Sequence, residues 1–187
     1  MKHSEIRQTI IETASDLFYK KGYNLTGINE IIKEAGIAKA TLYNHFRSKN
    51  DICLAYLEFK NSTFLENIKI YVSKAPKGKK QLLAIFDFLN IFFKDKGFNG
   101  CWCIKTVAEI PAEKEVIRKE IQNQKNQFLQ FINQLTEENF PKRSAKENKA
   151  ISKYIYLLYE GAVAESHLHQ DSWPIDSAKE LCKIIIK

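Results

Sequence analysis

The stretch "GIAKATLYNHFRSKND", residues 36–51, decides how this sequence folds. Gly36 permits a tight turn with positive φ between two short helical segments. After that turn, Leu42 and Phe46 lie four residues apart, so they share one helix face and anchor the helix in a core. The other face is left with small and polar side chains: Lys39, Ala40, Thr41, Tyr43, Asn44 and His45. An ordinary amphipathic helix does not need Tyr, Asn and His exposed together, so this face indicates a polar partner.

Helical spacing on both sides of this stretch predicts an all-α chain of about nine helices. A first helix with an apolar stripe ends at Gly22, and Thr26 is expected to cap a helix over 28–35. The next helix covers 38–46, and two helices joined by a glycine-containing turn form a helix-turn-helix. Residues 1–47 are therefore predicted to form a three-helix DNA-binding domain.

The rest of the chain, residues 48–187, is predicted to form a second helical domain. Ser48 caps a helix that runs to about Ser73, and Ser144 with Glu147 forms a capping box for another. Further helices are expected at about 80–95, 101–109, 113–138, 145–168 and 175–186.

Composition excludes several classes of protein. The chain of 187 residues is 44% hydrophobic and 27% charged, which is typical of a globular protein and not of a disordered one. Its most apolar run is interrupted by Asp87 and Asn90, so it falls short of a membrane span. The polar N-terminus lacks the apolar core of a signal peptide. We expect a cytoplasmic protein without cofactor or metal, because the four cysteines lack zinc-site spacing.

The exposed face of 38–46 has the chemistry of a DNA-reading helix. Asn and Lys read base edges, whereas Thr and Ala contact the thymine methyl group in the major groove. Tyr and His donate to phosphate. The net charge of +7 agrees with an anionic partner. However, residues 1–60 carry nine Lys and Arg against seven Asp and Glu, so bulk charge does not locate the site.

The segment "TGINEIIKEAGIAKATLYNHFRSKNDI" resembles the N-terminal DNA-binding motif of the TetR family of bacterial transcriptional repressors. The resemblance covers roughly residues 6–56. It implies that Thr41, Tyr43 and His45 meet DNA. It also implies that Lys49, at the start of the next helix, and Thr26 contact the phosphate backbone. Ala38 departs from the Ser that many members carry there as a cap, at a cost on the order of 1 kcal/mol.

The same resemblance implies a C-terminal domain that dimerises and binds an effector, with no role for a membrane. Helix 145–168 carries Ile151, Tyr154, Ile155 and Leu158, followed by the small residues Gly161, Ala162 and Ala164. Small residues allow close approach of helices, so this helix is suited to a helix–helix interface, together with helix 175–186. Alternatively, these helices only complete the monomer core. A two-fold dimer predicts a palindromic operator of double-stranded DNA. The aromatic-rich middle helices suit a small, apolar effector; its candidate contacts are Phe86, Phe92, Cys101, Trp102, Lys105, Phe128, Glu160 and His167.

Cys101 supports a separate hypothesis. It is expected at a helix N-terminus with Lys105 one turn further on, and both features favour a thiolate. Gly100-Cys101 also resembles a branch of the TetR family in which some members sense electrophiles or oxidants through a cysteine here. A buried structural thiol is the alternative reading.

Two other functions compete with a ligand-responsive, sequence-specific regulator. One is an all-helical enzyme or small-molecule-binding protein with an incidental helix-turn-helix. It is disfavoured because the sequence has no nucleophile–base set, phosphate loop or metal-ligand spacing. The other is a non-specific nucleic-acid binder, which would show a steep salt dependence with little sequence discrimination.

Overall fold

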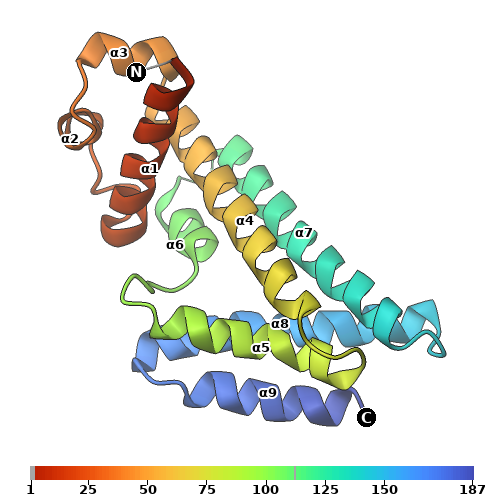
Figure 1. The fold of residues 1–187 in the computed structure, drawn as a ribbon. Coiled ribbons are helices and arrows are strands. Elements are labelled where there is room, and N and C mark those ends of the chain that lie inside the picture. Colours follow the sequence, from red (N-terminus) through yellow and green to blue (C-terminus); the bar gives the residue numbers. More distant parts are fainter. Residues whose placement is uncertain (1–2, 112) are drawn as a thin grey trace. The chain divides into compact units, whose positions relative to one another are not determined.

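The structure is a computed structural model that describes residues 3–111 and 113–187. Within these residues the chain is all-α, as predicted, with nine helices and no strand (Figure 1). The helices are α1 (His3–Lys21), α2 (Ile28–Glu34), α3 (Lys39–His45), α4 (Lys49–Ser73), α5 (Lys79–Lys94), α6 (Trp102–Glu109), α7 (Glu115–Asn139), α8 (Ala145–His169) and α9 (Trp173–Ile185). No helix in the described part of the chain has the length and apolar character needed to cross a bilayer.

Two predicted helix caps are present, at Ser48 before α4 and at Ser144 before α8. The capping box of α8 is confirmed, because Ser144 and Glu147 each accept the other's backbone amide. The start of α9 differs from the prediction by two residues. Trp173 and Pro174 lie inside its first turn, where a proline costs no intrahelical hydrogen bond.

The contacts divide the chain into two compact units. Unit 1 consists of Met1–Thr63 with Trp102–Gln124, and unit 2 of Phe64–Cys101 with Lys125–Lys187. Helices α4 and α7 therefore contribute their first parts to unit 1 and their last parts to unit 2. This grouping concerns packing, and the division of function at residue 47 stays a prediction.

Unit 1 holds the helix-turn-helix. In it α1 packs on α2, and α2 packs on α3 (Figure 1). Its buried side chains come from every helix in the unit and include Ile10, Phe18, Ile31, Leu42, Ile52, Tyr56 and Cys103. A module of 47 residues is marginal alone, and burial of Ile52 and Tyr56 shows that the first turns of α4 add to this core.

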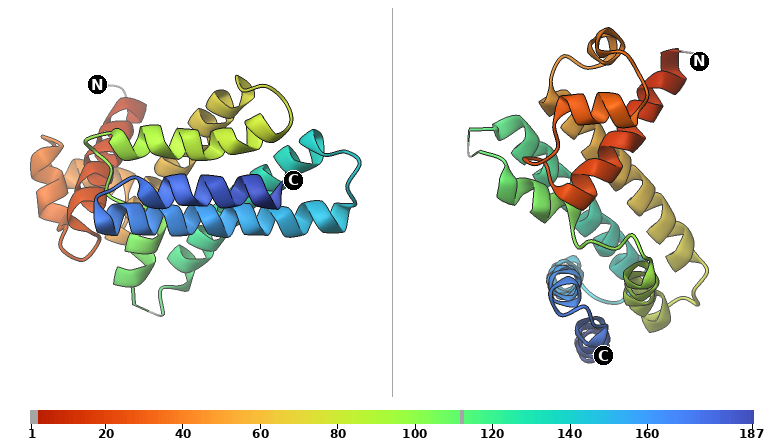
Figure 2. Two further views of the ribbon diagram at one scale, coloured as in Figure 1. Left: turned by 90° about the horizontal axis from the view of Figure 1, so that it is seen from below. Right: turned by 90° about the vertical axis from the view of Figure 1, so that its left-hand side faces the viewer.

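Unit 2 has its own core. Helix α9 lies alongside α8 and packs on α5, an arrangement seen from three directions in Figures 1 and 2. The largest buried residues of this core include Ile68, Leu82, Ile85, Phe86, Phe128, Ile132, Ile155, Tyr159, Ile175 and Ile186. Its polar edge includes Thr136 and Ser152, whose hydroxyls are hydrogen-bonded.

Candidate nucleic-acid interface

The turn between α2 and α3 is set by Gly36, which has φ of +64°. The Gly36 amide donates to the Lys33 carbonyl and the Ile37 amide donates to the Ile32 carbonyl, each at 3.2 Å. These bonds close the end of α2 in the way that glycine-ended helices commonly do. The angle between α2 and α3 is therefore fixed by backbone bonds, with a residue suited to the left-handed conformation at the corner.

Helix α3 separates its residues into a buried and an exposed face, as predicted. Leu42 is fully buried and Phe46 is 4% exposed. Tyr43, next to Leu42 in the sequence, is 44% exposed. Around it Lys39, Ala40 and Asn44 are exposed, while Thr41 and His45 are half-buried. A helix held by two apolar side chains thus displays a ring, an amide and an ammonium to its surroundings.

His45, at the end of α3, has neighbours that sequence reasoning did not identify. Its ring lies 4.1 Å from that of His3, centroid to centroid. The Nδ1 atom of His45 is buried and has no hydrogen-bond partner among the described residues. Burial, with smaller contributions from the charges of His3 and Arg7, lowers the pKa of His45. Since α1 begins at His3, the first turn of α1 belongs to this candidate interface.

Lys49 lies at the start of α4, where the resemblance places a phosphate contact. Ser48 caps this helix, because its hydroxyl accepts the Asp51 amide at 3.2 Å. The Lys49 ammonium lies 4.2 Å from the centroid of the Tyr23 ring, and burial lowers the pKa of Lys49. The Tyr23 hydroxyl donates to the Asn50 side-chain oxygen at 2.6 Å. Tyr23 therefore positions the Lys49 ammonium. The sequence did not indicate this role, because Tyr23 lies in the segment "KKGYN" that ends α1.

Thr26 does not cap α2, so that prediction was wrong. Gly27 is the N-cap residue and makes no side-chain bond. Thr26 is fully buried, and its hydroxyl donates to the Gly22 carbonyl at 2.8 Å. The hydroxyl holds the loop between α1 and α2 in place. We therefore leave Thr26 out of the proposed interface.

Helix α6 is hydrogen-bonded to the same loop. The Asn24 amide donates to the Glu109 carboxylate at 2.8 Å, and the Asn24 side chain donates to the Glu109 carbonyl at 2.9 Å. Lys105 donates to the Tyr19 carbonyl at 2.9 Å, and burial lowers its pKa. These contacts join residues more than 80 positions apart, which is why no local pattern could predict them.

Comparison with known proteins identifies this module. Residues 10–56 match the family model described as bacterial regulatory proteins, tetR family. These residues, which contain the helix-turn-helix, are therefore similar to the DNA-binding region of that family. The chain is a DNA-binding transcriptional regulator, and its helix-turn-helix lies within the matched residues.

Curated regulators match either nearly the whole chain or a part of it. The transcriptional repressor NemR of Escherichia coli is 24% identical over 99% of this chain and 96% of its own. The regulator SAB2452 of Staphylococcus aureus is 40% identical, over 35% of each chain.

Solved structures share the fold. SCO4454 of Streptomyces coelicolor, a TetR-family regulator, is 24% identical, with a TM-score of 0.87 over 98% of this chain and 95% of its own. Reduced NemR of E. coli is 22% identical, with a TM-score of 0.88 over 98% and 97%. The reported relatives are transcriptional regulators and not enzymes.

The residues expected to contact an effector fall in both units of this regulator. Trp102 and Lys105 belong to unit 1, and the other six belong to unit 2. Trp102 is 8% exposed, and the Lys60 ammonium lies 5.9 Å from the centroid of its ring.

Two of the unit 2 residues meet at a lysine that the sequence did not single out. Lys125 of α7 donates to the Cys101 sulfur at 3.1 Å and to the Glu160 carboxylate at 2.6 Å. Burial raises the pKa of the Glu160 carboxyl, and the Lys125 ammonium opposes that shift. Cys101 directly precedes α6, as expected, but the ammonium that contacts its thiol is that of Lys125. The lysine is on α7, 24 positions from the cysteine, so no local spacing indicated it.

The aromatic members of the predicted set lie around two other side chains. Phe86 and Phe128 both contact the Tyr159 ring, with centroids 6.3 and 4.8 Å apart. Phe92 and His167 both contact Phe98, edge to face, at 5.4 and 6.0 Å. The His167 Nε2 also lies 2.9 Å from the Asn99 side-chain oxygen. Burial raises the pKa of Tyr159. The sequence did not identify Tyr159 as a contact of these rings, because its spacing equals that of ordinary core residues.

Helix α8 carries an exposed apolar stripe. Tyr154, Leu157 and Leu168 are 53%, 65% and 71% exposed. Gly161 and Ala164 lie between them at alternating steps of three and four residues, so all five share one face. Helix α9 adds Leu181 and Ile184, at 49% and 59%. Two residues that the sequence placed in the same seam, Ile155 and Ala162, instead face the core.

Proposed function

We propose that this protein is a dimeric repressor that binds a palindromic operator and is released from it by a small apolar effector. The observation that carries the proposal is the exposed face of α3. Lys39 and Asn44 are available for base edges there, and Tyr43 is available for phosphate. The reading head is placed within residues 1–47, and the remaining residues are assigned to dimerisation and effector binding.

The exposed stripe on α8 supports the dimer. Burying such a stripe lowers the free energy by roughly 25 cal/mol for each Å² of apolar surface removed from water. A second copy presents the same stripe, so a two-fold interface can pair α8 and α9 with their equivalents in a four-helix arrangement. Gly161 and Ala164 allow close approach of the two α8 helices. The two reading heads would then occupy successive major-groove turns about 34–36 Å apart.

The effector is proposed to bind in unit 2, near Glu160 and Lys125. The half-buried ion pair of Lys125 and Glu160 would supply one polar anchor, and Phe92, Phe128 and His167 of the same unit would supply aromatic contacts, the usual composition of a small-molecule site. Binding alone would not release DNA. The effector must bind the released conformation more tightly than the DNA-bound one, and the ratio of those affinities sets the response.

Footprinting of the DNA that flanks the protein's own gene tests this function. We expect a protected palindrome, and loss of binding of about 1–3 kcal/mol for each mismatched base pair. Equal affinity for unrelated DNA of the same length would contradict sequence-specific regulation. It would favour the non-specific alternative, which depends on the dispersed basic charge.

Cys101 is a second candidate sensor, favoured by its contact with Lys125. An ammonium at 3.1 Å from the sulfur stabilises a thiolate, the form that reacts with electrophiles and oxidants. If Cys101 senses them, Cys101→Ser keeps operator binding but no longer releases DNA when an electrophile is added. Cys182→Ser, at a buried thiol whose pKa burial raises to about 12, is the matched control. Unchanged release in Cys101→Ser would leave Cys101 as a structural thiol.

A further inference from the structure

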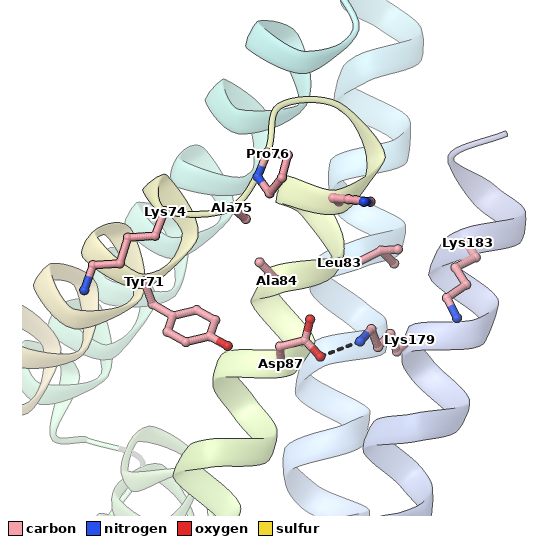
Figure 3. A pocket seen from close by; sticks show the side chains of 10 residues that line it. Tyr71, Lys74, Ala75, Pro76, Leu83, Ala84, Asp87, Lys179 and Lys183 are labelled. Atoms are coloured by element: carbon pink, nitrogen blue, oxygen red, sulfur yellow. Dashed lines mark hydrogen bonds and ion pairs between the residues drawn. The ribbon is translucent and has the colours of Figure 1, made fainter.

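Unit 2 contains a cavity of about 450 Å³ that the proposed effector residues do not line (Figure 3). It lies where the end of α4, the turn after it, the start of α5 and helix α9 come together. Its lining residues are Tyr71, Lys74, Ala75, Pro76, Lys80, Leu83, Ala84, Asp87, Lys179 and Lys183. Four lysines and one aspartate are therefore gathered around one cavity.

The sequence around the turn explains this charge. Residues 67–86 contain five lysines and neither Asp nor Glu. Two of them, Lys74 and Lys80, line the cavity, and neither forms an ion pair with any residue that the structure describes. Lysines this close together repel one another, and an anion bound between them would relieve that repulsion.

Helix α9 supplies the other two lysines. Lys179 is paired with Asp87 of α5, and Figure 3 shows this ion pair bridging the two helices. The pair uses the one carboxylate in the lining and fixes the position of the Lys179 ammonium. Lys183, one turn further on, pairs with Glu180 of its own helix. Such an exposed pair is weak, so its ammonium is readily redirected to a ligand.

The interior of the cavity is apolar. Ala84 is 4% exposed, and Leu83, Ala75 and Pro76 extend this surface. Tyr71 forms one wall and is held by the Phe88 ring, 5.7 Å away between centroids. A fully hydrated ion such as inorganic phosphate would leave this apolar surface uncovered. A ligand with an apolar chain would cover it.

From this juxtaposition we propose that the cavity binds an amphipathic anion, a small molecule with a carboxylate or phosphate headgroup and an apolar chain. The headgroup is held by Lys80 and Lys183 at the rim, and the chain lies against Tyr71, Leu83 and Ala84. The site is separate from the effector residues near Glu160, so the proposal does not depend on which effector that region binds.

Titration calorimetry on the full chain, without DNA, tests the ligand class. The probes are octanoate, octyl phosphate, inorganic phosphate and octanol, each below its aggregation concentration. We expect octanoate, octyl phosphate or both to bind at least about tenfold more tightly than inorganic phosphate and octanol, because only the amphiphiles use both halves of the site. The tighter of the two amphiphiles identifies the headgroup. Inorganic phosphate or octanol binding as tightly as both amphiphiles would overturn the proposal.

A charge-matched pair of variants locates the site. Lys80→Gln with Lys183→Gln is expected to weaken binding of the tighter amphiphile about 25-fold, or about fivefold for each ammonium removed. The control, Lys69→Gln with Lys153→Gln, removes two exposed lysines outside the cavity and should leave the affinity unchanged. An equal loss in both double variants would mean that net charge alone drives binding. No loss in the first would place the ligand elsewhere. Either result would overturn the proposal.

Discussion

Helices α3 and α8 each expose a face that does not contribute to the core of the monomer, but the two faces differ in polarity. The exposed face of α3 carries an ammonium, an amide and a tyrosine hydroxyl around Tyr43. That of α8 carries Tyr154, Leu157 and Leu168, with small residues between them. The first face can form directed hydrogen bonds, whereas the second gains free energy mainly by losing contact with water.

This difference indicates two kinds of partner. Hydrogen-bonding groups discriminate between partners, because an unmatched buried donor or acceptor costs about 1–3 kcal/mol. Apolar stripes discriminate poorly but suit an identical copy of themselves. We therefore propose that the α3 face contacts DNA and that the α8 face contacts a second subunit. Four substitutions, at Leu157, Asn44, Tyr43 and Lys49, test this assignment, and a fifth tests the burial of His45.

The largest effect is expected from Leu157→Glu on α8. A carboxylate at the centre of the stripe would have to lose its water in the interface, so the dimer should dissociate. Operator affinity should fall by about 100-fold or more, because a monomer holds one half-site only. Sedimentation and operator titration measure the two effects. Ile91→Glu, on α5 with 54% exposure, is the control, and a dimeric Leu157→Glu protein would refute the interface.

Asn44→Ala should have the next largest effect. If its amide reads a base edge, operator affinity falls by about 1–3 kcal/mol and discrimination at one base pair is relaxed. Binding to a set of operator variants measures this change. Asn29→Ala, exposed on α2, should behave like the parent protein. An unchanged sequence preference in Asn44→Ala would remove the reading role from this residue.

Tyr43→Phe and Lys49→Ala should weaken binding by about 1 kcal/mol each and equally on all sequences, since phosphate contacts carry no base information. Lys49→Ala should also lower the slope of log affinity against log salt by about one. Lys142→Ala, in an exposed loop, controls for loss of charge. A sequence-dependent loss in either variant would show that these residues read bases.

The smallest effect concerns His45 and pH. Its pKa in the folded protein lies below the ordinary value of 6.5, so the unfolded chain takes up this proton first as pH falls. The stability of unit 1 should therefore decrease as pH falls from about 7 through 6.5 and below. His45→Gln should remove part of that decrease in chemical unfolding between pH 7.5 and 5, whereas His169→Gln should not. An identical pH profile for parent and His45→Gln would contradict the effect.

The reading head was largely predictable because its information is local. The four-residue spacing of Leu42 and Phe46 identified the buried face of α3, and Gly36 identified the turn. The prediction for Thr26 failed because a threonine before a helix resembles a cap. Its hydroxyl instead bonds backward to Gly22, in a loop that the local pattern does not describe.

The effector region was predictable only as a list of aromatic and polar residues. Lys125 and Tyr159, which join the members of that list, lie on α7 and α8 and are distant from Cys101 and Phe86 in sequence. Helical periodicity reports which residues are buried together on one helix. It carries no information on which residue of another helix they contact.

The sequence by itself determined the approximate positions of the helices and the buried and exposed faces of α3, because hydrogen bonding and apolar spacing act within a few residues. Only the tertiary structure decided which side chains meet. It placed Lys125 beside both Cys101 and Glu160, and it gathered lysines from the turn after α4 and from α9 around one cavity. These contacts join residues 24 to about 100 positions apart, and packing between helices sets them.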